Sequence, residues 1–216
     1  MKKLFLLLFL SSIFWSCSDK EGPVRQVERA GYYWQRGDYT ASVDDPIQRY
    51  AIKKLYIKYF EVDYSDVKGN FPFAKIYLDG ASFKLNKFQK VIPTIFIKNN
   101  VFKYSSEKQL DKLADNIVFL TNKYNQEKFK AIEEFEEIQI DCDWTESTQK
   151  KYFYFLSKIK KLSKKTISCT LRLYPFAYPE KMGIPPVDKA MLMCYNLIKP
   201  LSAVSYTHLR AHETRH

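Results

Sequence analysis

The chain has 216 residues, of which 46% are hydrophobic and 16% aromatic, and it carries a formal net charge of +11. This length is sufficient for one domain with a substantial core. All three histidines lie within the last nine residues, which excludes Ser-His-Asp and Cys-His catalysis elsewhere in the chain. We therefore expect no cofactor and no metal, an all-carboxylate calcium site being the one metal alternative.

The first sixteen residues are typical of an export signal. Lys2 and Lys3 precede the apolar run Leu4–Leu10, which is too short to span a bilayer stably. The boundary before Cys17 resembles a bacterial lipoprotein signal, in which Cys17 would be lipidated. We expect a signal peptide over 1–16, a lipidated cysteine and polar tether over 17–30, and a bacterial cell-envelope location, lipid-anchored and facing the periplasm or the surface. An ordinary cleaved signal with an incidental cysteine is the alternative.

We expect the C-terminal end of the chain to lie outside the fold. Val204–Thr214 resembles a translated sequencing adaptor, although the four-residue spacing of His208, His212 and His216 would also suit zinc on one helix face. We expect residues 203–216 to be a non-native tail and the natural sequence to be cut near Ser202. Without the signal and this tail, the formal charge is about +8.

The lysines and cysteines suit a folded, solvated domain. Lysines interleave with apolar residues over 150–165, as on solvated helix faces, so we expect no nucleic-acid partner. A basic exterior would favour anionic lipid headgroups or acidic polysaccharide. Cys142, Cys169 and Cys194 each lie in an apolar, strand-like run, which favours buried thiols over disulfides.

Strand-like and helix-like segments alternate along the chain. Six segments have the apolar or aromatic runs of strands: Gly31–Trp34, Lys54–Tyr64, Val91–Phe102, Glu137–Trp144, Thr166–Tyr174 and Lys189–Asn196. Phe73–Leu78 is a further short candidate. Helical patterns occupy a turn within Pro46–Lys54, the segment Ser106–Asn125 with Ser106 as its N-cap, and a segment after Thr145 or Ser147 with the apolar stripe Tyr152, Phe155, Leu156, Ile159 and Leu162.

This alternation predicts parallel strands joined by right-handed crossovers. We expect an α/β fold, a (β/α)8 TIM-barrel-like domain over 31–202 that is truncated after about the sixth strand, since a full barrel takes roughly 250 residues. The strand at Glu137 would be about the fourth. An open doubly wound sheet is the alternative, although the sequence has no G-x-G-x-x-G or P-loop motif.

Two acids end the predicted fourth strand, where barrels place their chemistry. Asp141 and Asp143 share one face of an extended strand, roughly 7 Å apart. Two carboxylates so close at a partly buried position should raise the pKa of one of them.

These residues also carry a family resemblance. Ile140–Trp144 and Leu192–Asn196 resemble the D-x-x-D-x-D-x-E run on the fourth strand and the M-x-Y-D run on the sixth strand of chitinase-like (family 18) glycoside hydrolases. The natural chain is also similar to bacterial lipoproteins of unassigned function with glycoside-hydrolase-like barrels. The sequence departs from the pattern at Ile138, Thr145 and Asn196, which replace the first acid, the acid-donating Glu and the final Asp, and Glu146 stands one position late.

The resemblance implies a polysaccharide or oligosaccharide partner. The catalytic candidates are Asp143 as general acid, Asp141 to orient it, Glu146, and Tyr195 as a donor to the substrate. The candidates for substrate binding are Trp144, Arg172, Tyr174, Asn196 and Asp63. Alternatively, Asp141 and Asp143 pair with Arg172 and only hold the barrel together. Three functions remain open: a glycoside hydrolase, a barrel that binds glycan without cleaving it, as Thr145 suggests, and a structural envelope lipoprotein.

Overall fold

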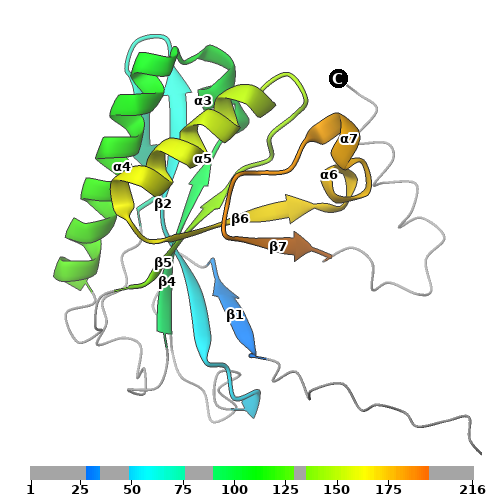
Figure 1. The fold of residues 1–216 in the computed structure, drawn as a ribbon. Helices are drawn as coiled ribbons and strands as arrows, with labels where there is room; N and C mark the ends of the chain where they lie inside the picture. Colours follow the sequence, from blue (N-terminus) through cyan, green and yellow to red (C-terminus); the bar gives the residue numbers. More distant parts are fainter. Residues whose placement is uncertain (1–27, 35–48, 76–89, 129–134, 195–216) are drawn as a thin grey trace, which may run out of the picture.

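The protein is an α/β structure built on one curled sheet, and the computed structural model describes residues 28–34, 49–75, 90–128 and 135–194 (Figure 1). Within these residues six parallel strands lie side by side in chain order: β1 (Ala30–Tyr33), β2 (Lys54–Ser65), β4 (Lys90–Ile97), β5 (Glu137–Asp141), β6 (Thr166–Arg172) and β7 (Lys189–Met193). β3 (Gly69–Phe73) pairs antiparallel with the end of β2. The strand order never reverses, so the sheet is a half-barrel and not the doubly wound alternative.

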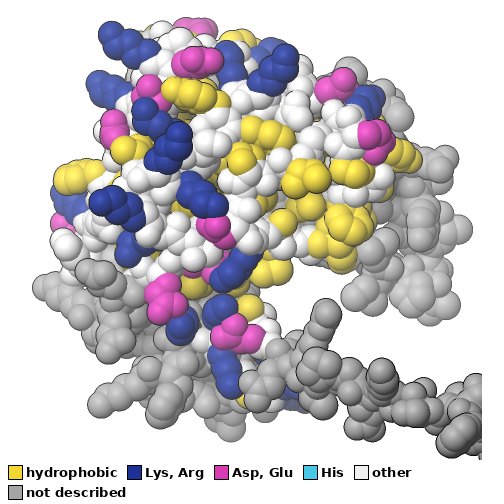
Figure 2. Space-filling model, in the orientation of Figure 1, with side chains coloured by type: hydrophobic (Ala, Val, Ile, Leu, Met, Phe, Trp, Pro, Cys, Tyr) yellow, Lys and Arg dark blue, Asp and Glu magenta, His cyan; other side chains and the backbone are white. Residues whose placement is uncertain are grey.

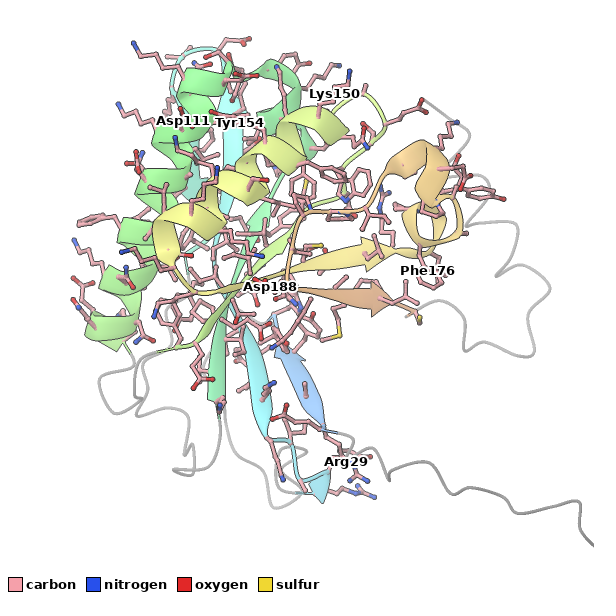
Figure 3. The ribbon with its side chains drawn as sticks, viewed as in Figure 1. Arg29, Asp111, Lys150, Tyr154, Phe176 and Asp188 are labelled. Carbon is pink, nitrogen blue, oxygen red and sulfur yellow. The ribbon has the colours of Figure 1, made fainter. Side chains whose placement is uncertain are left out.

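Helices connect the parallel strands. They are α3 (Asn99–Tyr104), α4 (Glu107–Lys128), α5 (Gln149–Ser163) and the short α6 (Leu173–Ala177) and α7 (Pro179–Met182). α4 and α5 lie side by side, and Asp111 of α4 accepts a hydrogen bond from Tyr154 of α5 at 2.9 Å and pairs with Lys158 at 3.0 Å (Figure 3). Figure 2 shows lysines and acids interspersed over this face, the pattern of a solvated helix surface.

The two faces of the sheet differ in chemistry because successive side chains of a strand point to opposite sides. On the helix side Ile57, Ile95, Ile140 and Ile167 are fully or almost fully buried beneath the aromatic side chains of α3 and α5. The inner side of the half-barrel carries polar groups at the same depth, including the fully buried Gln139. The apolar layer therefore packs the helices against the sheet, whereas the polar layer takes no part in that packing.

A bulge in β2 changes which side chains reach the inner face. Lys58 pairs with Thr94 of β4, but the next residue in register is Phe60, so Tyr59 is extra. Tyr59 and Phe60 both face the helices, where the Tyr59 hydroxyl donates to Asn125 at 3.1 Å. The bulge thus brings Lys58 and Glu61, three residues apart, to the same inner face.

The predicted strands and the two long predicted helices are present, with corrected ends, whereas the helical turn predicted within Pro46–Lys54 lies mostly outside the described residues. The strand predicted over Val91–Phe102 ends at Ile97, because Asn99 begins α3. The strand predicted to reach Trp144 ends at Asp141, and the one predicted to reach Tyr174 ends at Arg172. The short strand near Phe73 ends there instead of beginning there. In each case polar or proline-containing sequence after the strand starts a turn or helix that the apolar run alone does not reveal.

Several predictions fall outside the described residues. These are the signal peptide, the lipidated Cys17, most of the tether, the last residues of the strand from Lys189, and the tail. Among the described residues no helix is both long and apolar enough to cross a membrane.

Candidate functional site

Asp141 is the last residue of β5 and lies on the inner face of the half-barrel. In register it adjoins Phe96 of β4, and on its other side the Thr170 hydroxyl of β6 donates a hydrogen bond of 2.5 Å to its carboxylate. The carboxyl ends of parallel strands share one edge of the sheet, so side chains from β2, β4, β5 and β6 surround it. Asp141 is therefore at the centre of the edge where the sequence predicts a site.

Burial raises the pKa of Asp141 to about 6, and the neighbouring charge of Asp143 acts in the same direction. The Thr170 hydrogen bond and the positive charges of Lys58 and Arg172 oppose this shift without cancelling it. The pair of acids was expected to raise the pKa of one member, and the pKa of Asp141 is raised, so that Asp141 stays protonated under mildly acidic conditions. The sequence-based assignment gave that role to Asp143.

Asp143 lies at the solvated rim, with a side chain 61% exposed. Its carboxylate is 3.4 Å from Nε of Arg172, whose Nη2 donates to the Trp144 carbonyl oxygen at 2.5 Å. This is the pairing that the structural alternative predicted for Asp143. It leaves Asp143 with a role in holding the β5–α5 loop against the end of β6.

Trp144 does not line the site. It is 1% exposed and packs against Tyr152 and Phe153 of α5, with ring centroids 5.9 and 5.2 Å away. The strand ends at Asp141, and the chain then carries the indole under α5 instead of out to the rim. The sugar-stacking role that the sequence suggests is therefore corrected to a core role.

The other acid of the loop is equally solvated. Glu146 lies 3.3 Å from Lys181 of α7, and both side chains are exposed. Thr145, at the position of the acid-donating Glu in the resembled motif, belongs to the turn before α5, where its amide donates to the Thr148 hydroxyl at 3.0 Å.

Of the remaining site candidates, the structure describes Tyr174, which lies in α6 directly after the carboxyl end of β6. Its ring packs against that of Tyr178 in a tilted arrangement, with centroids 4.8 Å apart. The same β6–β7 connection carries the exposed Phe176 (Figure 3). Tyr195 and Asn196 lie outside the described residues, so their positions relative to Asp141 stay predictions.

Asp63 lies near the end of β2, where its carboxylate already has three donors. Lys98 donates at 2.5 Å, Asn100 at 2.6 Å and the Tyr64 amide at 2.7 Å. Although burial alone would raise it, these hydrogen bonds lower the pKa of Asp63. The residue is thus an ionised anchor for the β4–α3 junction, and its oxygens are occupied.

Sequence reasoning missed Lys58 and undervalued Glu61. Glu61 is 8% exposed, and Nζ of Lys58 lies 2.5 Å from its carboxylate. Simple alternation places residues three apart on opposite faces, so only the bulge at Tyr59 brings this pair together. No sequence signal marks that bulge. Glu61 is therefore a mostly buried residue of β2 and not a solvated charge of a loop.

Below this layer the inner face remains polar. Glu137 is buried and accepts hydrogen bonds from Tyr56 at 3.1 Å and Lys189 at 2.9 Å. Burial acts to raise the pKa of Glu137, but these donors and the Lys189 charge leave it lowered. Gln139 is fully buried, and neither atom of its amide makes a hydrogen bond with a described residue.

The comparisons with known proteins give no further guide. No protein-family model, curated protein or solved structure matches the chain.

Proposed function

We propose that this protein is an exported lipoprotein, anchored to the bacterial cell envelope through Cys17, whose half-barrel is part of a TIM-type barrel that acts on or binds polysaccharide. The single observation that carries the proposal is Asp141, a mostly buried carboxyl with a raised pKa at the carboxyl end of the fourth parallel strand. Chemistry in such barrels gathers at this edge. The sequential order of the parallel strands supports the barrel reading.

The chemistry of glycosidic cleavage fits this carboxyl. Cleavage needs an acid that is protonated at the working pH and a second group that stabilises the oxocarbenium-like transition state. Burial gives Asp141 the first property. Arg172 and Lys58, whose charges act on Asp141, offer hydrogen-bond donors for sugar hydroxyl groups at the same edge.

Binding without cleavage is the second candidate, and specific contacts favour it. Thr145 replaces the acid-donating Glu of the resembled motif and belongs to a turn. Asp143 and Glu146 are paired with Arg172 and Lys181. A barrel that had lost its acid would keep a polar edge for glycan and lack turnover.

A binding and hydrolysis assay on the same samples separates the candidates. The full chain is tested against soluble oligosaccharides from chitin, cellulose, xylan, starch and peptidoglycan, with reducing ends measured after incubation. Hydrolysis that falls at least 100-fold in Asp141→Asn, but not in the helix-surface control Asp111→Asn, supports the enzyme. Binding with no new reducing ends supports the glycan-binding alternative. Neither binding nor cleavage across the panel contradicts both.

The anchor has its own test. Cells expressing the full chain are fed a radiolabelled fatty acid, and the envelope fraction is compared for the wild type and Cys17→Ala. Label and envelope retention that both depend on Cys17 support lipidation. Retention without label in either protein would contradict it.

A further inference from the structure

We propose that the β6–β7 connection forms a platform on which a glycan chain lies, next to the carboxyl edge that holds Asp141. The platform consists of the large hydrophobic side chains that this connection exposes, Phe176, Tyr178 and Ile184. This inference rests on the proposed binding of polysaccharide, and it names the surface that holds the sugar rings with or without cleavage. It gives other residues the stacking role that the buried Trp144 cannot fill.

Two ion pairs join the β6–β7 connection to the loop that follows Asp141. Nε of Arg172, the last residue of β6, lies 3.4 Å from the carboxylate of Asp143, and Nζ of Lys181 in α7 lies 3.3 Å from that of Glu146. β6 pairs with β5 in the sheet, and α6 and α7 lie at the carboxyl end of β6 (Figure 1). A ligand on the platform is therefore next to the edge where Asp141 ends β5.

Hydrophobic side chains gather on this part of the surface. Figure 2 shows them beside α5 and over the β6–β7 connection, and Figure 3 shows Phe176 near the end of β6. Phe176 is 59% exposed, Tyr178 48% and Ile184 79%. Single exposed apolar side chains are ordinary, whereas several that gather in one place are characteristic of a binding surface.

Buried contacts fix this connection against α5. Met182 of α7 is 3% exposed and belongs to the hydrophobic core. The Gly183 amide donates a hydrogen bond to the Pro179 carbonyl oxygen at 2.8 Å. Gly183 has a φ of +69°, and a Cβ atom there would lie 2.1 Å from the Gln149 side chain, so the backbone packs directly on α5. A surface that is ordered before binding loses little conformational entropy when a ligand arrives.

The size of the platform suits a narrow ligand and not a protein partner. Aromatic side chains have areas of roughly 150–250 Å², so three side chains with these exposures offer roughly 350 Å². A stable protein interface buries about 800 Å² on each partner. A sugar chain is one ring wide, and a surface of this size accommodates a few of its rings.

The chemistry of the platform also suits a sugar. A pyranose ring has faces lined by C–H groups, which pack on aromatic rings, and hydroxyl groups around its rim, which need polar partners. Lys181 lies between Tyr178 and Ile184 in the chain, and its partner Glu146 lies on the facing loop. Both charged side chains are more than half exposed and can form hydrogen bonds with sugar hydroxyl groups.

The affinity of platform variants for glycan tests the proposal. The full chain is titrated calorimetrically with the oligosaccharide of the panel above that the wild type binds best. We expect the double variant Phe176→Ala/Tyr178→Ala to lose about 10-fold or more in affinity, because truncation of aromatic anchors removes most of the contact. The matched control is Phe119→Ala/Tyr154→Ala, which removes two exposed aromatic side chains of α4 and α5 and should bind within about 2-fold of the wild type.

A gain of signal guards against loss of binding through misfolding. Phe176→Trp keeps an aromatic ring at the platform, so it should bind at least as tightly as the wild type. Its added indole emission should shift to shorter wavelength when the glycan is bound, because a sugar ring displaces water from it. The same substitution at the distant Phe119 should give no such shift.

The outcomes separate the platform from the proposed function. Wild-type affinity in the folded double variant, or an indole emission at Phe176→Trp that glycan leaves unchanged, overturns the platform and leaves glycan binding by the protein intact. A dimer in sedimentation that the double variant abolishes overturns it in favour of contact between two copies of the chain. No glycan binding by the wild type removes the proposed function, and the platform with it.

Discussion

The pKa of Asp141 is raised, because most of its carboxyl is out of water and its hydrogen-bond partner is the neutral Thr170 hydroxyl. Two residues later, Asp143 is exposed to solvent and forms an ion pair with Arg172. The difference follows from where β5 ends. Asp141 is still held by the sheet, whereas Asp143 already belongs to the loop.

The raised pKa of Asp141 predicts a pH-dependent stability. The folded pKa of about 6 lies above the ordinary value of 3.8, so the folded state binds more protons between these two values. The contribution of Asp141 to the free energy of unfolding, up to about 3 kcal/mol, is fully present below about pH 4. It is lost as the pH rises through 6. In urea unfolding from pH 4 to 7, the stability of the wild type relative to Asp141→Asn should therefore decline. Parallel pH profiles for the two proteins would contradict it.

The burial of Trp144 makes a second prediction at the residue scale. Trp144→Ala should lower the free energy of unfolding by about 3–5 kcal/mol, because it opens a cavity beneath α5. The matched control is Phe119→Ala, an aromatic of α4 that is 65% exposed and should change stability by less than about 0.5 kcal/mol. Denaturant midpoints measure both. A loss below about 1 kcal/mol for Trp144→Ala would mean that the indole is not in the core.

At the scale of elements, the start of α4 was predictable from local sequence. Ser106 and Gln109 form a capping box, in which the Ser106 amide donates to the Gln109 side chain at 2.8 Å and the Gln109 amide donates to the Ser106 hydroxyl at 3.4 Å. Two residues, three positions apart, suffice to specify this feature. The end of β4 was not predictable in the same way. Apolar residues resume at Val101 and Phe102 after a short polar stretch, and the core buries them from a helix instead of a strand.

The capping box can be tested by substitution. Ser106→Ala should cost about 1 kcal/mol of stability, and Ser106→Asp should recover most of it because aspartate accepts the same amide hydrogen bond. Thermal unfolding of the three proteins measures the effect. Equal stability of the alanine and aspartate variants would contradict a capping role.

At the scale of the whole molecule, the alternation of strand-like and helix-like segments predicted the parallel sheet and its strand order. What alternation could not give is the inner face. Lys58 and Glu61 meet only because of the bulge at Tyr59, and Thr170 meets Asp141 only because β5 and β6 pair in one particular register. Both depend on contacts between segments far apart in the chain. A motif on one strand can point to an edge, but it does not identify the partners that other strands bring there.

The two buried thiols report on the integrity of the whole sheet. Burial raises the pKa of the Cys142 thiol well above its ordinary value and that of Cys169 to about 12. Neither should react with Ellman's reagent in the folded protein, whereas Cys194, which is less buried, should react readily. With Cys17 replaced by alanine, the number of thiols that react is measured before and after unfolding. Rapid labelling of Cys169 in native buffer would contradict the buried sheet.

The most direct measurement of the central claim is the ionisation of Asp141 itself. With ¹³C-labelled aspartate, the carboxyl resonance of Asp141 is followed by NMR from pH 3 to 8 and assigned by its absence in Asp141→Asn. A midpoint near pH 6 would establish a carboxyl that stays largely protonated under mildly acidic conditions at the carboxyl edge of the sheet. A midpoint near 4 would make Asp141 an ordinary surface acid, and the case for chemistry at this edge would fall with it.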